Sequence, residues 1–235
     1  MPKVLSAILL DLDGTLVDSA PQLAEAVNGA LQPLGRRTLA LEEVRGMIGQ
    51  GLPALTRAAL AATGGDPGEA AGEAILGEVR AIYDRLPPPE VYDGVRESLG
   101  LWHGAGLHLV ICTNKPEGSA RRLLAELDLD RYIARLAGGD SYPQRKPHPD
   151  HLLRPLGELG IDPASAIMVG DSGTDARAAR DAGIPFIAVT YGYSRERPEQ
   201  LGAAAAVDRF GDVGGAIHQV AAERGLAFPP PASAV

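Results

Sequence analysis

Short apolar runs alternate with helical patterns through most of the chain. In the helical stretches, apolar residues recur at every third or fourth position, over residues 94–105, 116–127, 149–159, 173–182 and 212–224. The runs suited to buried parallel strands are residues 4–10, 107–112, 166–169, 186–189 and, more weakly, 203–207. Strand and helix in regular alternation predict an α/β fold, a doubly wound parallel sheet with right-handed crossovers.

The pattern changes between residues 20 and 86, where helix-like segments follow one another with no strand candidate between them. Turn-rich residues at 34–38 and 63–68 divide this stretch, and three consecutive prolines stiffen its end. We therefore expect an all-helical cap at 19–87, inserted into a core formed by 1–18 and 88–228. The small and proline-rich residues 229–235 predict a disordered tail.

Charge and composition narrow the classes of partner. The 235 residues carry a formal net charge of −8 without a basic stripe, so we expect no nucleic acid and no membrane surface as a partner. No apolar run approaches the length of a membrane span, and the N-terminus has no secretory pattern. Together with the single cysteine, Cys112, this predicts a cytoplasmic protein, expected as a monomer or weak homodimer.

Two carboxylates end the first strand candidate. Asp11 and Asp13 lie one residue apart, so they leave an extended strand on the same side, and Gly14 permits a sharp turn there. Two like charges held this close favour a bound divalent cation. One carboxylate can then attack phosphorus while the other transfers protons.

Polar residues also follow the later strand candidates. They are Thr113, Asn114 and Lys115 after 107–112, Lys146 after the weak apolar segment 133–137, and Asp171, Ser172 and Asp175 after 166–169. In an open parallel sheet the ligand site lies beyond the carboxyl ends of the strands, so these residues should meet at one place. Thr113 can hold phosphate oxygens, Lys146 can neutralise charge on phosphorus, and Asp171 can join Asp11 around Mg²⁺. Asp175 is expected near the metal or beside Lys146.

Four segments resemble the ordered motifs of the haloacid dehalogenase superfamily. They are DLDGTLVDS from Asp11, CTNKP around Thr113, RKPHP around Lys146 and GDSGTD ending at Asp175. Within that superfamily, the forms TNKP, RKPHP and TYGY (residues 190–193) are most similar to the phosphoglycolate phosphatase group.

This resemblance implies roles for the matching residues. Asp11 would form an aspartyl-phosphate, while Asp13 would protonate the leaving alcohol and then activate water. Mg²⁺ would be held by Asp11, Asp171 and the main-chain carbonyl of Asp13. The remaining motif residues would hold the phosphoryl group (Thr113, Asn114 and Lys146) or support the site (Thr15, Ser172 and Asp175).

The helical stretch offers weaker candidates. Gly49 and Gly51 predict either a helix-breaking turn or a loop that closes over the substrate. Arg45, one turn earlier, could pair with a substrate carboxylate, although an exposed helical arginine is the more common case. Lys115 stays outside the expected catalytic set, because at a helix start it can simply point to solvent.

The expected function is a Mg²⁺-dependent phosphomonoester hydrolase acting on a small organic phosphate ester, with 2-phosphoglycolate first among the substrates. A sugar-phosphate phosphatase or a pyrophosphatase of the same superfamily is the alternative. A different class also remains open, a non-catalytic phosphoacceptor or binding module with similar aspartates at its strand ends. Phosphate release from an aryl phosphate, with and without Mg²⁺, separates an enzyme from a binding module.

Overall fold

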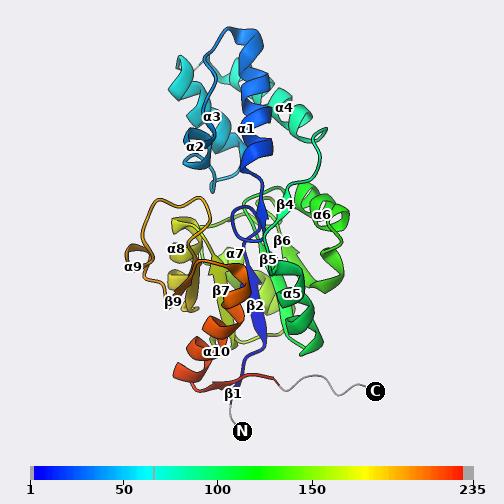
Figure 1. The fold of residues 1–235 in the computed structure, drawn as a ribbon, viewed down its shortest axis with the longest axis vertical. Coiled ribbons are helices and arrows are strands. Elements are labelled where there is room, and N and C mark those ends of the chain that lie inside the picture. Colours follow the sequence, from blue (N-terminus) through cyan, green and yellow to red (C-terminus); the bar gives the residue numbers. More distant parts are fainter. Residues whose placement is uncertain (1–2, 66, 230–235) are drawn as a thin grey trace.

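The computed structural model describes residues 3–65 and 67–229, whose central feature is a six-stranded parallel sheet in the order β6-β5-β2-β7-β8-β9 (Figure 1). These strands are β2 (Ala7–Leu10), β5 (His108–Cys112), β6 (Ile133–Ala137), β7 (Ala166–Gly170), β8 (Phe186–Val189) and β9 (Ala205–Val207). Every residue of β2 is buried, as expected for a central strand covered on both faces. The predicted α/β fold with a parallel sheet is confirmed.

Helices cover both faces of the sheet. Because successive strand residues point to opposite faces, Ile8 and Leu10 pack with α5, α6 and α10, whereas Ala7 and Leu9 pack with α7 and α8. The helices of the core are α5 (Val95–Gly104), α6 (Glu117–Glu126), α7 (Asp150–Glu158), α8 (Gly173–Ala182), α9 (Pro198–Leu201) and α10 (Val213–Glu223). Short 3₁₀ helices cover Gln32–Leu34, Asp130–Tyr132, Pro163–Ser165 and Phe210–Asp212.

The first apolar run, residues 4–10, forms two strands and not one. β1 (Lys3–Val4) pairs in parallel with β10 (Leu226–Ala227), and only β2 joins the main sheet. Between them, the amide of Ser6 donates to the carbonyl of Ser165 (2.8 Å), so the chain changes partner there. The partner of β1 comes from the other end of the chain, which an apolar pattern does not reveal.

Helices α1 (Ala20–Leu31), α2 (Leu41–Arg45), α3 (Leu52–Thr63) and α4 (Glu69–Tyr83) lie between β2 and β5 in the chain. We call residues 20–83 the helical insert. It has its own apolar core, which includes Val27, Leu60 and Val79. Figure 1 shows the insert beyond the end of the sheet where β2 finishes, joined to it through the antiparallel pair β3 (Val17–Asp18) and β4 (Glu90–Val91). Its boundaries as a separate domain, 19–87, stay a prediction.

The predicted disordered tail, 229–235, lies outside the described residues except for Pro229. Within the described ranges, no helix has both the length and the apolar character that crossing a bilayer requires.

Candidate active site

The loops after β2, β5 and β7 meet at the carboxyl edge of the sheet. β2 lies between β5 and β7, and the chain adds β5 and β6 on one side of it before it adds β7 and β8 on the other. Open α/β sheets bind ligands at such a switch point. Asp11, Thr113 and Asp171 are each the first residue after one of these strands. The fold therefore brings together the strand-end residues that the sequence singled out.

Lys146 occupies the centre of a buried charged cluster. Its Nζ lies 2.8 Å from Asp11 Oδ1 and 2.6 Å from Asp175 Oδ1, and its side chain is 1% exposed. One carboxylate oxygen from each of Asp11, Asp171 and Asp175 lies within 4.8 Å of the others. Burial alone would lower the pKa of Lys146, but Asp11 and Asp175 outweigh it and raise the pKa above its usual value. The charged form of Lys146 is therefore favoured by its two acidic partners, Asp11 and Asp175.

This cluster has the composition of a divalent-cation site. Burial raises the pKa of Asp11 well above its usual range, and Asp175 adds to the effect while Lys146 opposes it. Burial, again with Asp175, raises the pKa of Asp171 to about 7. Both pKa shifts mean that desolvation and mutual repulsion disfavour the charged carboxylates. A hard divalent cation bound between them would stabilise the charged forms. The donor set fits such a metal.

Asp175 is held so that one oxygen faces Lys146. It forms a capping box with Ser172 at the start of α8. Both the amide (3.0 Å) and the hydroxyl (2.5 Å) of Ser172 donate to Asp175 Oδ2, which leaves Oδ1 for Lys146. Asp175 therefore lies beside Lys146, one of the two expected positions, while a position near the metal stays a prediction supported by its place in the acidic cluster.

The segment 190–193 contacts the Asp171 carboxylate and fixes its position. The amide of Tyr193 donates to Asp171 Oδ2 at 2.6 Å. A Cβ at Gly14, where φ is +84°, would meet that oxygen at 2.6 Å, and a Cβ at Gly192 would collide with the same carboxylate. Both glycines thus allow backbone to close on Asp171. Nearby, the hydroxyl of Tyr191 donates to the carbonyl of buried Thr15 (2.7 Å).

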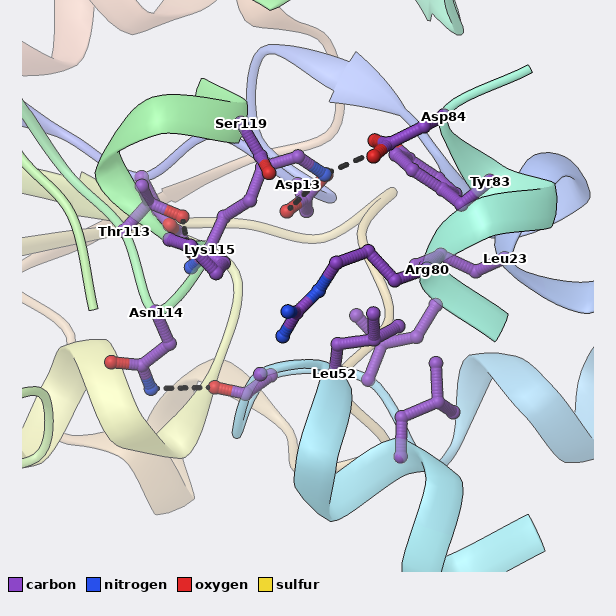
Figure 2. A pocket seen from close by; sticks show the side chains of 16 residues that line it. Asp13, Leu23, Leu52, Arg80, Tyr83, Asp84, Thr113, Asn114, Lys115 and Ser119 are labelled. Atoms are coloured by element: carbon purple, nitrogen blue, oxygen red, sulfur yellow. Dashed lines mark hydrogen bonds and ion pairs between the residues drawn. The ribbon is translucent and has the colours of Figure 1, made fainter. Parts of the chain in front are cut away.

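A pocket of about 60 Å³ opens between this edge of the sheet and the helical insert (Figure 2). Its floor is polar and includes Asp11, Asp13 and Thr113. Its opposite wall, from the insert, includes the apolar residues Leu23 and Leu52. The pocket can therefore hold a small ligand with one anionic end at the floor.

The loop with Gly49 and Gly51 lines this pocket and touches the sheet edge. Asn114 Nδ2 donates to the carbonyls of Gly49 (2.9 Å) and Lys146 (3.1 Å). A Cβ at Gly51 would meet the Asn114 carbonyl at 2.9 Å. Both hydrogens of the Asn114 side-chain amide are thus donated to backbone, so a contact with phosphate would come from its main-chain amide, and the role of Asn114 in holding the phosphoryl group stays a prediction.

Arg45 lies away from the pocket. Its Nη2 is 3.2 Å from Asp18 Oδ2 and its Nη1 is 3.0 Å from Glu42 Oε1, and it does not line the cavity. The expectation that Arg45 pairs with a substrate carboxylate is therefore wrong for this structure. The arginine that the insert places in the pocket is Arg80, on α4.

Lys115 belongs to the pocket, so the solvent-facing alternative is wrong. The residue is buried, with Nζ 3.2 Å from Asp13 Oδ1 and 2.9 Å from the hydroxyl of Tyr83 on α4. Burial opposes its charge, but Asp13 and Tyr83 outweigh burial and raise the pKa of Lys115. Lys115 thus links Asp13 to the helical insert. Its place directly after Thr113 and Asn114 made it a candidate, but nothing in the sequence indicated the side to which it turns.

Comparisons with known proteins agree with this geometry. A family model described as haloacid dehalogenase-like hydrolase matches residues 5–183. The phosphoglycolate phosphatase of Rhodospirillum rubrum is 42% identical over 220 residues, which cover 91% of this chain and 90% of that protein. Phosphoglycolate phosphatase 1 of Pseudomonas aeruginosa is 42% identical over 194 residues, which cover 81% of this chain and 71% of that protein.

Solved structures show the same fold. A predicted phosphoglycolate phosphatase from Haemophilus somnus superposes with a TM-score of 0.87 at 29% identity, covering 91% of this chain and 98% of that one. CbbY from Rhodobacter sphaeroides, in complex with phosphate, has a TM-score of 0.78 at 26% identity, covering 90% and 97%. Since the family model spans most of the chain and the Rhodospirillum rubrum relative is 42% identical over 90% of its own length, the chain belongs to the haloacid dehalogenase-like hydrolases.

Proposed function

We propose that this protein is a phosphatase that hydrolyses small phosphate monoesters, with 2-phosphoglycolate as the leading substrate. The observation that carries this proposal is the buried pair of Asp11 and Lys146, 2.8 Å apart, in which Asp11 lines a pocket that also presents Asp13 and Thr113. The names of the relatives support the substrate.

Asp11 is the proposed nucleophile. Lys146 Nζ and the amide of Leu12 both contact Asp11 Oδ1 at 2.8 Å, so the carboxylate is fixed in one orientation. An Asp11 oxygen forms a bond to phosphorus while the ester P–O bond breaks, and the leaving oxygen takes a proton from Asp13. Water then attacks phosphorus and gives a proton to Asp13. The bond from phosphorus to Asp11 breaks, which releases inorganic phosphate and restores Asp11.

Phosphoryl oxygens are proposed to bind Thr113 and Lys146. An ammonium has three donors, and Asp11 and Asp175 account for two of those of Lys146. Mg²⁺ is the proposed metal, held by Asp11, Asp171 and the main-chain carbonyl of Asp13. When bound, it screens the anionic nucleophile from the anionic substrate.

The helical insert is proposed to act as a cap. Contacts that join it to the core include Gly49 with Asn114 and Tyr83 with Lys115, and Asp84, the residue directly after the insert, binds Arg122 (2.8 Å). Their separation would open the pocket, and their formation would exclude bulk water during phosphoryl transfer. Every group in the proposed reaction comes from one chain, so a monomer or weak homodimer suffices.

The test is release of inorganic phosphate from 2-phosphoglycolate with and without Mg²⁺, in the wild type and in Asp11→Asn. The substitution keeps the shape of the side chain but removes its negative charge, so we expect at least about a 1000-fold loss of turnover with an unchanged circular dichroism spectrum. Asp162→Asn, at an exposed acid paired with Lys3, is the matched control and should retain activity. Unchanged turnover in Asp11→Asn would refute the nucleophile. Phosphate binding without hydrolysis of any ester would favour a binding module.

A further inference from the structure

We infer that Arg80 selects substrates that carry a carboxylate, binding that group while the phosphoryl end lies at Asp11. This inference rests on the proposed phosphatase function and deepens it, since it names the second chemical group of the substrate.

Arg80 lies where it can reach a ligand in the pocket. It is in the last turn of α4, and both Arg80 and Tyr83, three residues later, line the cavity. Figure 2 shows the Arg80 side chain extended from α4 across the pocket, between Tyr83 and Leu52, toward the side that carries Asn114 and Lys115. The guanidinium therefore faces the space above the polar floor.

The Arg80 guanidinium has no hydrogen bond or ion pair with any described residue. Asp84, four residues later, is its natural partner on the helix, but Asp84 Oδ1 binds Arg122 Nη2 at 2.8 Å. Lys115, the other cation among the described residues lining the pocket, is already bound to Asp13 and Tyr83. Arg80 is thus the pocket cation that remains available to a ligand.

The surroundings of Arg80 favour a carboxylate as its partner. The walls beside Arg80 include the apolar residues Leu23, Leu52 and Leu55. The two polar side chains next to it, Tyr83 and Asp84, are already bound to Lys115 and Arg122. A guanidinium binds the two oxygens of a carboxylate through paired N–H donors, and the Arg80 side chain is exposed and so accessible to a ligand. Lys146 does not line the pocket but contacts Asp11, which does, so a phosphoryl end at Asp11 and a carboxylate at Arg80 would each lie near a different cation.

The experiment compares kcat/KM for 2-phosphoglycolate with that for 2-hydroxyethyl phosphate, in which CH₂OH replaces the carboxylate. In Arg80→Ala, the ratio of the two values should fall about 10- to 100-fold, the range expected when a charge-assisted hydrogen-bonded pair is lost. Arg80→Lys should show a smaller fall, because lysine keeps the charge without the paired donors. Arg57→Ala is the matched control, since Arg57 is an exposed arginine of α3 that does not line the pocket, and its ratio should equal that of the wild type.

The outcomes separate this inference from the proposed function. An equal loss for both substrates in Arg80→Ala would overturn the inference and assign Arg80 a structural role, and so would an unchanged ratio. A greater loss for pyrophosphate than for 2-phosphoglycolate would also overturn it, because the partner would then be a second phosphate. If the wild type hydrolysed none of these compounds, the proposed function itself would fail, and the inference with it.

Discussion

Replacing Lys146 by Met tests whether one buried cation holds the acidic cluster together. The substitution keeps an unbranched side chain of similar length and removes the charge that contacts Asp11 at 2.8 Å and Asp175 at 2.6 Å. The three acids that share oxygens within 4.8 Å would then face one another without that cation.

The expected cost follows from the burial of the pair. At these distances, and with an effective dielectric constant of about 20, each contact is worth roughly 6 kcal/mol of gross attraction. Most of this offsets the desolvation of the ammonium, so the net loss on removing one partner of a buried pair is about 3–5 kcal/mol. Because Met leaves the carboxylates without a neighbouring cation, we expect Lys146→Met to lower the free energy of unfolding by an amount in that range when no metal is bound.

Urea unfolding at neutral pH in EDTA measures this loss. Trp102 is the single tryptophan, lies buried on α5 and reports on the core through its fluorescence. The control is Lys3→Met, which removes a pair with Asp162 whose side chains are 64% and 57% exposed, and it should cost less than about 1 kcal/mol. Adding Mg²⁺ should recover part of the loss in Lys146→Met, because a bound cation replaces the missing charge.

A second substitution decides whether repulsion is the cause. Asp175→Asn removes one acid from the cluster, so the double variant should be more stable than Lys146→Met alone by more than about 1 kcal/mol. If Lys146→Met unfolds at the wild-type urea concentration, or if Asp175→Asn deepens the loss, the electrostatic account of the cluster is wrong.

Two further predictions concern a buried histidine and a glycine. Burial, with a smaller effect of Lys146, lowers the pKa of His151 to about 4, below the usual value of about 6.5, so the unfolded chain binds more protons between these values. The free energy of unfolding should therefore fall by about 2–3 kcal/mol because of this group as the pH drops from 6.5 toward 4. In His151→Gln, the urea midpoint should fall less over that pH range than in the wild type. The same dependence of the midpoint on pH in both proteins would contradict this prediction. Gly192→Ala places a Cβ against the Asp171 carboxylate and should weaken Mg²⁺ binding about 10-fold in calorimetric titration. Gly215→Ala, on α10 with no atom near its added Cβ, is the control, and equal affinities in the two variants would exclude the clash as a cause.

Parallel topology explains why most of the core site could be predicted. Strand and helix periods are visible over a few neighbouring residues, and parallel strands all end at the same edge. Asp11, Thr113 and Asp171 therefore had to lie near one another once the strands were recognised. The same logic could not place Lys115, because a residue just past a strand can turn to either side, and contacts with Asp13 and Tyr83 decide which.

In the helical insert, the sequence did not predict which side chains enter the pocket. Helical periodicity identified its helices, but Arg45 and Arg80 both occupy helices with a polar face, and nothing local tells which of them faces the core. Only tertiary structure, with Asp18 binding Arg45 and Arg122 binding the Asp84 carboxylate beside Arg80, decides this. In the same way, only the fold shows that β1 pairs with β10 and that the Asn114 amide binds Gly49. The sequence by itself determined the elements and the acids at the ends of strands, since those depend on near neighbours. The lining of the pocket depends on contacts between distant segments, which only the folded chain brings together.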